Sequence, residues 1–225
     1  LENIKTWVRH HASTEKETEI TLFLKTLEPK YHPHDFDQFV DGELIDTKWL
    51  GIRPGGSARL KQINLTGKTN LIINYSADNA GGSLEIRIDK INGETIGNSL
   101  LETTKDRKAI TIALKPTEGK HDLYFIFRNP RLDANKSVCA VEWLAFREAL
   151  PGKESDGYDM ITRSFVELLN TTVDKTPIMI ENGKEQHRTT HVFERGNWLV
   201  KGEPVEPGVP KSLNPFPKDQ PYNRL

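Results

Sequence analysis

The chain has 225 residues, with 36% hydrophobic and 28% charged, a balance that can bury the core of one ample domain. Its 31 lysines and arginines oppose 32 acidic residues, so it lacks the basic excess typical of nucleic-acid binders. Cys139 is the single cysteine, which excludes an internal disulfide and a CxxC site for zinc or covalent haem. No apolar run approaches the roughly 20 residues that a membrane helix needs, so we expect no membrane insertion.

Residues 1–30 predict a short amphipathic helix. Four apolar residues at the spacing i, i+3, i+4, i+7 share one face: Ile20, Phe23, Leu24 and Leu27. Thr14 and Glu17 predict a capping box, and Pro29 predicts the end of the helix. One such helix cannot bury its own apolar stripe, so we expect it to be the end of a preceding domain. The chain begins at Leu1 without a signal peptide, and we expect it to be a piece of a longer protein.

Residues 31–150 change to a period of two, which is typical of strands. The clearest runs are residues 71–75, 84–89, 109–114, 123–128 and 138–146. Asn92-Gly93 predicts a tight hairpin, because both residues tolerate the positive φ of a type I′ turn. About eight short strands without helices between them predict an all-β fold, an antiparallel β-sandwich.

Residues 151–225 predict one helix and then an extended tail that begins a following domain. Ile161, Phe165 and Leu169 share a helical face, and the helix ends near Asn170. Six prolines then punctuate the tail and favour an extended path: Pro204, Pro207, Pro210, Pro215, Pro217 and Pro221.

Several motifs occur in the order that family 6 carbohydrate-binding modules show. The segments are Asp35-Phe36-Asp37, the strand 81–89 (GGSLEIRID), residues 92–97 (NGETIG), residues 119–127 (GKHDLYFIF) and residues 140–146 (AVEWLAF). Together they resemble this family over roughly residues 32–147, about half of the chain. The resemblance implies a jelly-roll β-sandwich and a non-catalytic module that binds a polysaccharide or oligosaccharide.

The residues that form the family's main cleft are replaced in this sequence. The family places an aromatic ring before the second strand, a second ring after the hairpin and an asparagine at the start of the last strand. The corresponding segments here are residues 57–61 (SARLK), residues 105–108 (KDRK) and Ala140. We therefore expect a sugar to use other side chains at the loop ends.

Five residues near loop ends are candidates for ligand binding: Trp49, Arg53, Arg59, Arg128 and Asn129. A tryptophan ring can stack on a pyranose, and a planar guanidinium can donate a forked pair of hydrogen bonds to hydroxyl or acidic groups. The alternative is that Trp49 packs in the sandwich and that the arginines are solvated.

The family resemblance also implies a structural calcium between the first and the last strand. The matching residues are His32, His34 and Glu142, with Asp35 as a further oxygen ligand. Calcium prefers oxygen ligands, whereas two imidazoles beside a carboxylate suit a borderline metal such as zinc. A His-Pro-His sequence is also an ordinary extended connector, and this reading stays open.

Enzymatic activity is not expected within this chain. No nucleophile elbow, phosphate loop or dinucleotide fingerprint occurs in the sequence. A glycosidase needs two carboxylates that face one cleft, and sequence spacing does not place them. Cys139 lies between apolar residues of a predicted strand, which favours a buried, inert thiol.

The tail holds a second resemblance. Residues 190–197 (THVFERGN), residues 202–210 (GEPVEPGVP) and residues 223–225 (NRL) are similar to the opening of a planctomycete-type domain of unknown function. Members of that family are large exported proteins in which a c-type cytochrome domain commonly precedes it. The resemblance implies an exported, multidomain parent whose other domains are partners of this module and whose haem lies outside this chain. The alternative function is a structural spacer that has lost sugar binding, and a third is an active site shared with the following domain.

Overall fold

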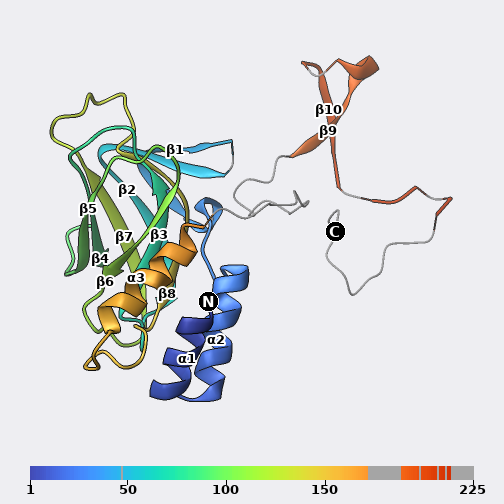
Figure 1. Cartoon of the computed structure of the whole chain (residues 1–225). Helices are drawn as coiled ribbons and strands as arrows, with labels where there is room; N and C mark the ends of the chain where they lie inside the picture. Colours follow the sequence, from blue (N-terminus) through green and yellow to red (C-terminus); the bar gives the residue numbers. More distant parts are fainter. Residues whose placement is uncertain (47, 172–188, 198, 207, 211, 214–225) are drawn as a thin grey trace. The chain divides into compact units, whose positions relative to one another are not determined.

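The computed structural model describes residues 1–46, 48–171, 189–197, 199–206, 208–210 and 212–213 (Figure 1). The chain divides into two units, Leu1–Val173 and Asp174–Leu225, each described by itself. The helices of the first unit are α1 (Glu2–His11), α2 (Thr14–Thr26), the 3-10 turn η1 (Pro33–Asp35) and α3 (Tyr158–Leu169). Its strands are β1 (Gln38–Ile45), β2 (Trp49–Asn64), β3 (Asn70–Ser76), β4 (Gly82–Ile88), β5 (Thr95–Leu101), β6 (Lys108–Ala113), β7 (Lys120–Arg128) and β8 (Cys139–Arg147).

The strands of the first unit form one antiparallel sheet that folds over into two layers. The strand order is β5-β4-β7-β2-β8-β3-β6, and β1 pairs with β2. The long strand β2 belongs to both layers, because Leu50–Ile52 pair with β8 whereas Ser57–Asn64 pair with β7. The predicted all-β antiparallel sandwich is thus confirmed.

The main core lies between the two layers, and strand alternation explains which side chains fill it. In β7, Leu123, Phe125 and Phe127 point inward and are buried, as the period of two predicts. Tyr124 and Ile126 therefore point outward, away from this core. Cys139 is fully buried here, and burial raises the pKa of its thiol.

A second core forms where α1, α2 and α3 cover the outer face of the β8–β3–β6 layer (Figure 1). The strands contribute outward apolar residues, namely Ile72, Ala109, Trp143 and Ala145. The helices contribute Ile4, Val8, Ile20, Phe23, Ile161, Phe165 and Leu169. The flanking short helices of the prediction are confirmed, and they are integral to the packing of this unit.

The prediction for residues 1–30 differs from the structure in the number of helices and in the residue that caps the second one. Two helices occupy the segment, and the sequence analysis missed α1, which buries only Ile4 and Val8. The N-cap of α2 is Ser13, whose hydroxyl accepts a hydrogen bond from the Lys16 amide at 3.3 Å. The Thr14–Glu17 capping box was therefore wrong by one residue.

The predicted type I′ hairpin at Asn92-Gly93 was also wrong. The positive φ falls on Asp89, at 61°, and not on Asn92 or Gly93. The connection is a longer loop in which the Ile88 amide bonds the Glu94 carbonyl at 3.0 Å. Gly93 is needed for another reason, since a Cβ there would clash with the Ile88 carbonyl oxygen.

The second unit contains an antiparallel hairpin of β9 (Thr190–Phe193) and β10 (Lys201–Val205), with a 3-10 turn η3 (Glu194–Gly196) between them. The hairpin carries part of the second sequence resemblance. Of the predicted extended tail, Pro207, Pro215, Pro217, Pro221 and the motif at residues 223–225 lie outside the described residues.

Candidate functional site

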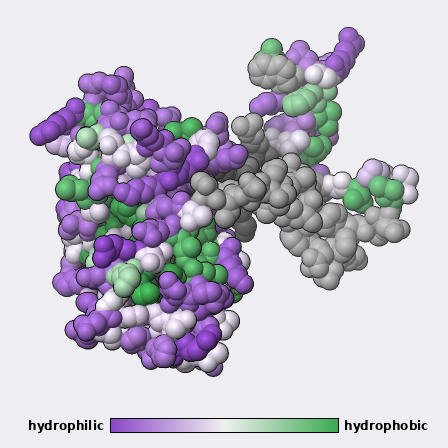
Figure 2. All heavy atoms as spheres, in the orientation of Figure 1, coloured by the Kyte–Doolittle hydropathy of each residue, from purple (hydrophilic) through white to green (hydrophobic). Residues whose placement is uncertain are grey.

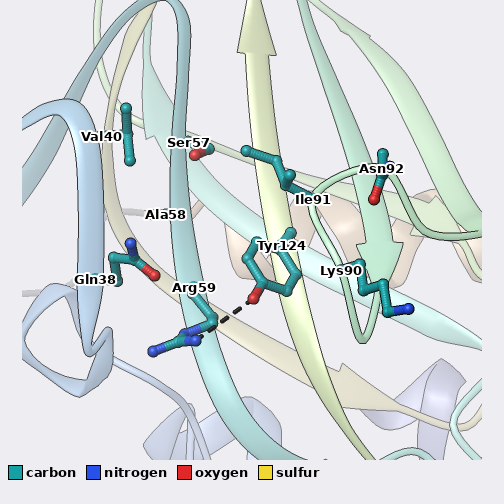
Figure 3. Close-up of a pocket in the computed structure, with 9 residues that line it drawn as sticks. All are labelled: Gln38, Val40, Ser57, Ala58, Arg59, Lys90, Ile91, Asn92 and Tyr124. Atoms are coloured by element: carbon teal, nitrogen blue, oxygen red, sulfur yellow. Dashed lines mark hydrogen bonds between the residues drawn. The ribbon is translucent and has the colours of Figure 1, made fainter.

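The outer face of the β2–β7–β4 layer bears an open depression of about 350 Å³ (Figure 3). β1 and β2 form one side, β7 forms the floor, and the β4–β5 loop forms the other side. The lining residues are Gln38, Val40, Ser57, Ala58, Arg59, Lys90, Ile91, Asn92 and Tyr124. Figure 3 shows Ile91 reaching from the loop toward Ser57 above the Tyr124 ring.

Arg59 is held over this depression by a dense polar network. Its Nε and Nη2 atoms donate to the two carboxylate oxygens of Asp37 at 3.0 and 2.6 Å. Lys61 Nζ lies 2.7 Å from the same carboxylate. Hydrogen bonds from Arg59 above all, and from Lys61, hold the pKa of Asp37 below its usual range. Arg59 Nη1 also donates to the Tyr124 hydroxyl at 3.4 Å, so the floor and the wall are joined.

The β4–β5 loop is fixed at its start and at its tip. His121 Nδ1 lies 3.0 Å from both carboxylate oxygens of Asp89, and His121 Nε2 lies 2.9 Å from the Glu118 carbonyl oxygen. These partners are acceptors only, so the imidazolium is the protonation state that satisfies both nitrogens. Arg87 Nη1 donates to the Ile91 carbonyl at 3.1 Å, which anchors the loop tip above the sheet.

A second network lies beside the depression on the same face. Glu85 accepts hydrogen bonds from Arg87 Nη2 at 2.9 and 3.0 Å and from the Thr95 hydroxyl at 2.6 Å. Arg128 Nη2 lies 3.9 Å from the same carboxylate. The Thr95 hydrogen bond first, and the Arg87 contact after it, hold the pKa of Glu85 below its usual range.

These carboxylates are poorly suited to acid catalysis. A glycosidase general acid needs a raised pKa so that it still carries its proton near neutral pH. Asp37 and Glu85 have lowered pKa values and stay ionised. Neither carboxylate is therefore suited to act as a general acid.

The structure separates the five predicted ligand residues. Arg59 lines the depression. Arg128 lies on the same face of the sheet, where it contacts Glu85. Arg53 is a partly exposed β2 residue 3.8 Å from Glu43. Asn129 is 2% exposed, and its amide is engaged by the Ala80 carbonyl at 2.9 Å and the Arg131 amide at 3.2 Å.

Trp49 lies elsewhere, where β2 pairs with β8. The Arg107 guanidinium lies over its ring at 4.4 Å from the centroid, and Arg107 Nε is 3.1 Å from a Glu142 carboxylate oxygen. The Trp49 Nε1 atom is buried without a hydrogen-bond partner among the described residues. One face of the predicted stacking ring is thus covered by an arginine.

The predicted metal ligands have protein partners instead of a shared centre. Asp35 accepts a hydrogen bond from the His32 amide at 2.6 Å and so closes the 3-10 turn. The rings of His32 and His34 stack at 5.2 Å, and Glu142 is engaged by Arg107. Across the described residues, no three histidine, cysteine or acidic side chains form a group that could hold a metal ion. His34, Asp35 and Glu142 therefore do not converge as ligands of one ion within the part of the chain that the structure describes.

Sequence reasoning missed Tyr124, Gln38 and Asn92. A signal for Tyr124 was available, because the inward Leu123 and Phe125 leave it facing outward by strand alternation. Gln38 and Asn92 carried no comparable signal, since their approach to Tyr124 depends on how β1 and the β4–β5 loop are placed by distant pairing.

Residues 46–148 match the family model described as carbohydrate binding module (family 6). This segment, somewhat less than half of the chain, therefore contains a family 6 domain, as the motifs predicted. It holds the sandwich from the start of β2 to the end of β8. No curated protein matches the chain.

Solved structures with similar folds include two family 6 modules and one larger enzyme. The module from Clostridium cellulolyticum in complex with xylose is 20% identical, with a TM-score of 0.46, and the match covers 53% of this chain and 96% of that one. A β-1,3-glucan binding module from Bacillus halodurans is 19% identical, with a TM-score of 0.45, covering 52% and 94%. A family 43 arabinoxylan arabinofuranohydrolase from Bacillus subtilis is 18% identical, with a TM-score of 0.41, covering 44% and 21%, so the chain spans about a fifth of that enzyme.

The described helices are all too short or too polar to cross a membrane.

Proposed function

We propose that this protein is a non-catalytic carbohydrate-binding module and that the sugar binds in the sheet-face depression. The observation that carries the proposal is the partly exposed Tyr124 ring at the floor, with hydrogen-bonding side chains on both sides. The family 6 domain at residues 46–148 supports the class of ligand.

The lining matches the two kinds of surface that a pyranose presents. A pyranose has an apolar face of C–H groups that can lie on an aromatic ring, and a rim of hydroxyls that need partners. Tyr124, Ile91 and Val40 supply apolar surface, whereas Gln38 and Asn92 supply amide donors and acceptors. The site is open at the top, which suits one stretch of a long polymer chain.

The setting of the module is a further part of the proposal. We place it in an exported, multidomain protein, where it holds the other domains near a polysaccharide. The second resemblance, in residues 190–210, supports a following domain of the planctomycete type and a cytochrome domain elsewhere in the parent. The helices at residues 1–30 would then connect the module to a preceding domain.

A structural spacer is the second candidate, and one observation favours it. Arg107 covers one face of Trp49, so the ring at the loop end offers less surface to a sugar. A spacer would bind no glycan at all, whereas a module with a displaced site would bind through Tyr124.

A glycan array with and without calcium, followed by calorimetry of three variants, tests the proposal. Tyr124→Ala should weaken binding about tenfold or more, because the stacking ring is lost. Tyr124→Phe keeps the ring and should bind within about threefold of the wild type. Trp49→Ala is the matched aromatic control at the loop end and should bind normally.

Two other results would contradict the proposed site or the proposed function. Loss of binding in Trp49→Ala but not in Tyr124→Ala would move the site to the loop end. Silence across the array, from protein with an intact thermal transition, would favour the spacer and overturn the proposed function.

A further inference from the structure

Basic side chains outnumber carboxylates on the face that holds the depression. We call this set the sheet-face cluster: Arg59, Lys61, Arg87, Lys90 and Arg128, with the carboxylates of Asp37 and Glu85. Two more carboxylates lie near this face: Asp89, at the start of the β4–β5 loop, pairs with His121, and Asp122 on β7 accepts hydrogen bonds from Gln62. The whole chain carries a formal net charge of -1, so this surplus is local.

Each carboxylate of the cluster is shared between two cations. One oxygen of Asp37 lies 2.6 Å from Arg59 Nη2 and 2.7 Å from Lys61 Nζ. Glu85 is similarly shared between Arg87 at 2.9 Å and Arg128 at 3.9 Å. Two carboxylates cannot neutralise four cations, so positive charge remains at the Arg59–Lys61 pair and at the Arg87–Arg128 pair, on either side of Tyr124.

Lys90 adds a further charge inside the depression itself. Its ammonium has no ion-pair partner among the described residues, and Lys90 lines the loop wall of the depression, with its side chain pointing away from Arg59 and Tyr124 in the view of Figure 3. None of the nine lining side chains is acidic. A neutral sugar would leave Lys90 solvated and unused, whereas an anionic one would pair with it.

We propose that the depression selects an anionic glycan, whose carboxylate or sulfate group pairs with Lys90 at the loop wall while a sugar ring lies on Tyr124. This inference rests on the proposed function and names the substrate class of the same site. Arg59 is positioned by Asp37 and can still present the outer edge of its guanidinium fork to a ligand. Positive potential in a partly enclosed hollow also raises the local concentration of an anionic polymer.

The test compares polymers that differ in charge but not in backbone. Polygalacturonate is paired with highly methyl-esterified pectin for the carboxylate arm, and κ-carrageenan with its chemically desulfated form for the sulfate arm. Binding of the full chain to each is measured at 50 and 300 mM NaCl. We expect one charged polymer to bind at least about tenfold more tightly than its neutral counterpart, and higher salt to reduce that preference.

Two lysine variants assign the effect to the site. Lys90→Gln removes one charge and keeps a polar side chain, and it should weaken binding of the charged polymer about three- to tenfold. Lys153→Gln removes an exposed charge away from the depression and should leave binding unchanged. Lys153→Gln should also leave binding of neutral polymers unchanged.

The outcomes separate the two proposals. Equal binding of the charged and neutral polymers, still lost in Tyr124→Ala, would overturn the charge selection and keep the proposed function. Equal weakening by Lys90→Gln and Lys153→Gln would also overturn it, because the attraction would then be diffuse. Failure of all four polymers to bind would overturn the charge selection, whereas silence across the whole glycan array would overturn both proposals.

Discussion

The two outer faces of the sandwich come from the same strand alternation and yet have opposite chemistry. On the β8–β3–β6 layer, outward residues such as Ile72 and Trp143 are apolar and lie under the helices. On the β2–β7–β4 layer, outward residues such as Arg59, Tyr124 and Glu85 are polar and uncovered. In the view of Figure 2, the apolar residues of the first unit lie in small groups among hydrophilic ones.

The difference separates stability from recognition. The helix-covered face contributes buried apolar area, which stabilises the fold in proportion to the surface removed from water. The side chains of the open face form ion pairs, which contribute little to stability when they are exposed. These ion pairs do hold charged groups where a ligand can reach them. Substitutions on the covered face should therefore unfold the protein, and substitutions on the open face should alter binding.

The largest effect is expected from Phe23→Ala on the covered face. Phe23 is fully buried, stacks on Phe165 at 6.3 Å and lies under the Arg147 guanidinium at 4.3 Å. Removing the ring should lower the free energy of unfolding by about 3–5 kcal/mol, through lost burial and the cavity left behind. Urea denaturation measures this loss. The neighbouring exposed Leu22→Ala should cost less than about 0.5 kcal/mol, and equal losses would contradict the distinction between the faces.

The next effect concerns the edge strand β6, which α3 protects through Asn170. The Asn170 side chain accepts from the Ala109 amide at 2.6 Å and donates to the Ala109 carbonyl at 3.0 Å, as a neighbouring strand would. Asn170→Ala should cost about 1–3 kcal/mol, because buried backbone groups lose their partners. Faster hydrogen exchange of the Ala109 amide would locate the loss. In Thr171→Ala, that amide should exchange as in the wild type.

Gly93→Ala links the open face to stability. The added Cβ would clash with the Ile88 carbonyl oxygen, so the β4–β5 loop must move, at a cost of about 1–3 kcal/mol. The same movement should weaken glycan binding, because Lys90 and Asn92 lie on this loop. Denaturation and calorimetry measure the two effects. Normal binding by a destabilised Gly93→Ala would show that the loop is not part of the site.

The smallest effect is the pH dependence that His121 confers on the loop. The Glu118 carbonyl first, and Asp89 second, raise the pKa of His121 above its ordinary value. The stabilisation is therefore fully present below the unfolded-state pKa of about 6.5 and is lost as the pH rises through the folded-state pKa. Urea midpoints for the wild type and Asp89→Asn should differ most at low pH and converge at high pH. A constant difference across the range would exclude the imidazolium.

The strands could be predicted from the sequence because burial on one side imposes a period of two. The period of two does not reveal what covers each side of a strand, and Trp143 is buried against the helices and not against the other sheet. α1 was missed because it buries only two residues, which is too few to produce a recognisable stripe. Strand order was also out of reach, since β2 exchanges one partner for another halfway along its length.

The candidate site was predicted in part, and Arg59 shows why. Its type and its place near a loop end suggested a ligand contact, and the structure puts it beside the depression. Asn129 looked equally suitable, but its amide organises the turn after β7. Only the folded structure shows whether a side chain already has a partner within the protein. Trp49 is a second example, because the Arg107 guanidinium lies over its ring.

The partner exchange of β2 has a consequence for the order in which the protein folds. Leu50 pairs with Val141, about 90 residues later in the chain, so one half of β2 waits for the last strand of the sandwich. Closing so long a loop is costly in chain entropy, and such non-local pairing slows folding. During synthesis, the apolar edge of β2 stays unpaired until β8 has left the ribosome. The nascent chain is therefore exposed to wrong strand pairing while the roughly 90 residues between Leu50 and Val141 are synthesised.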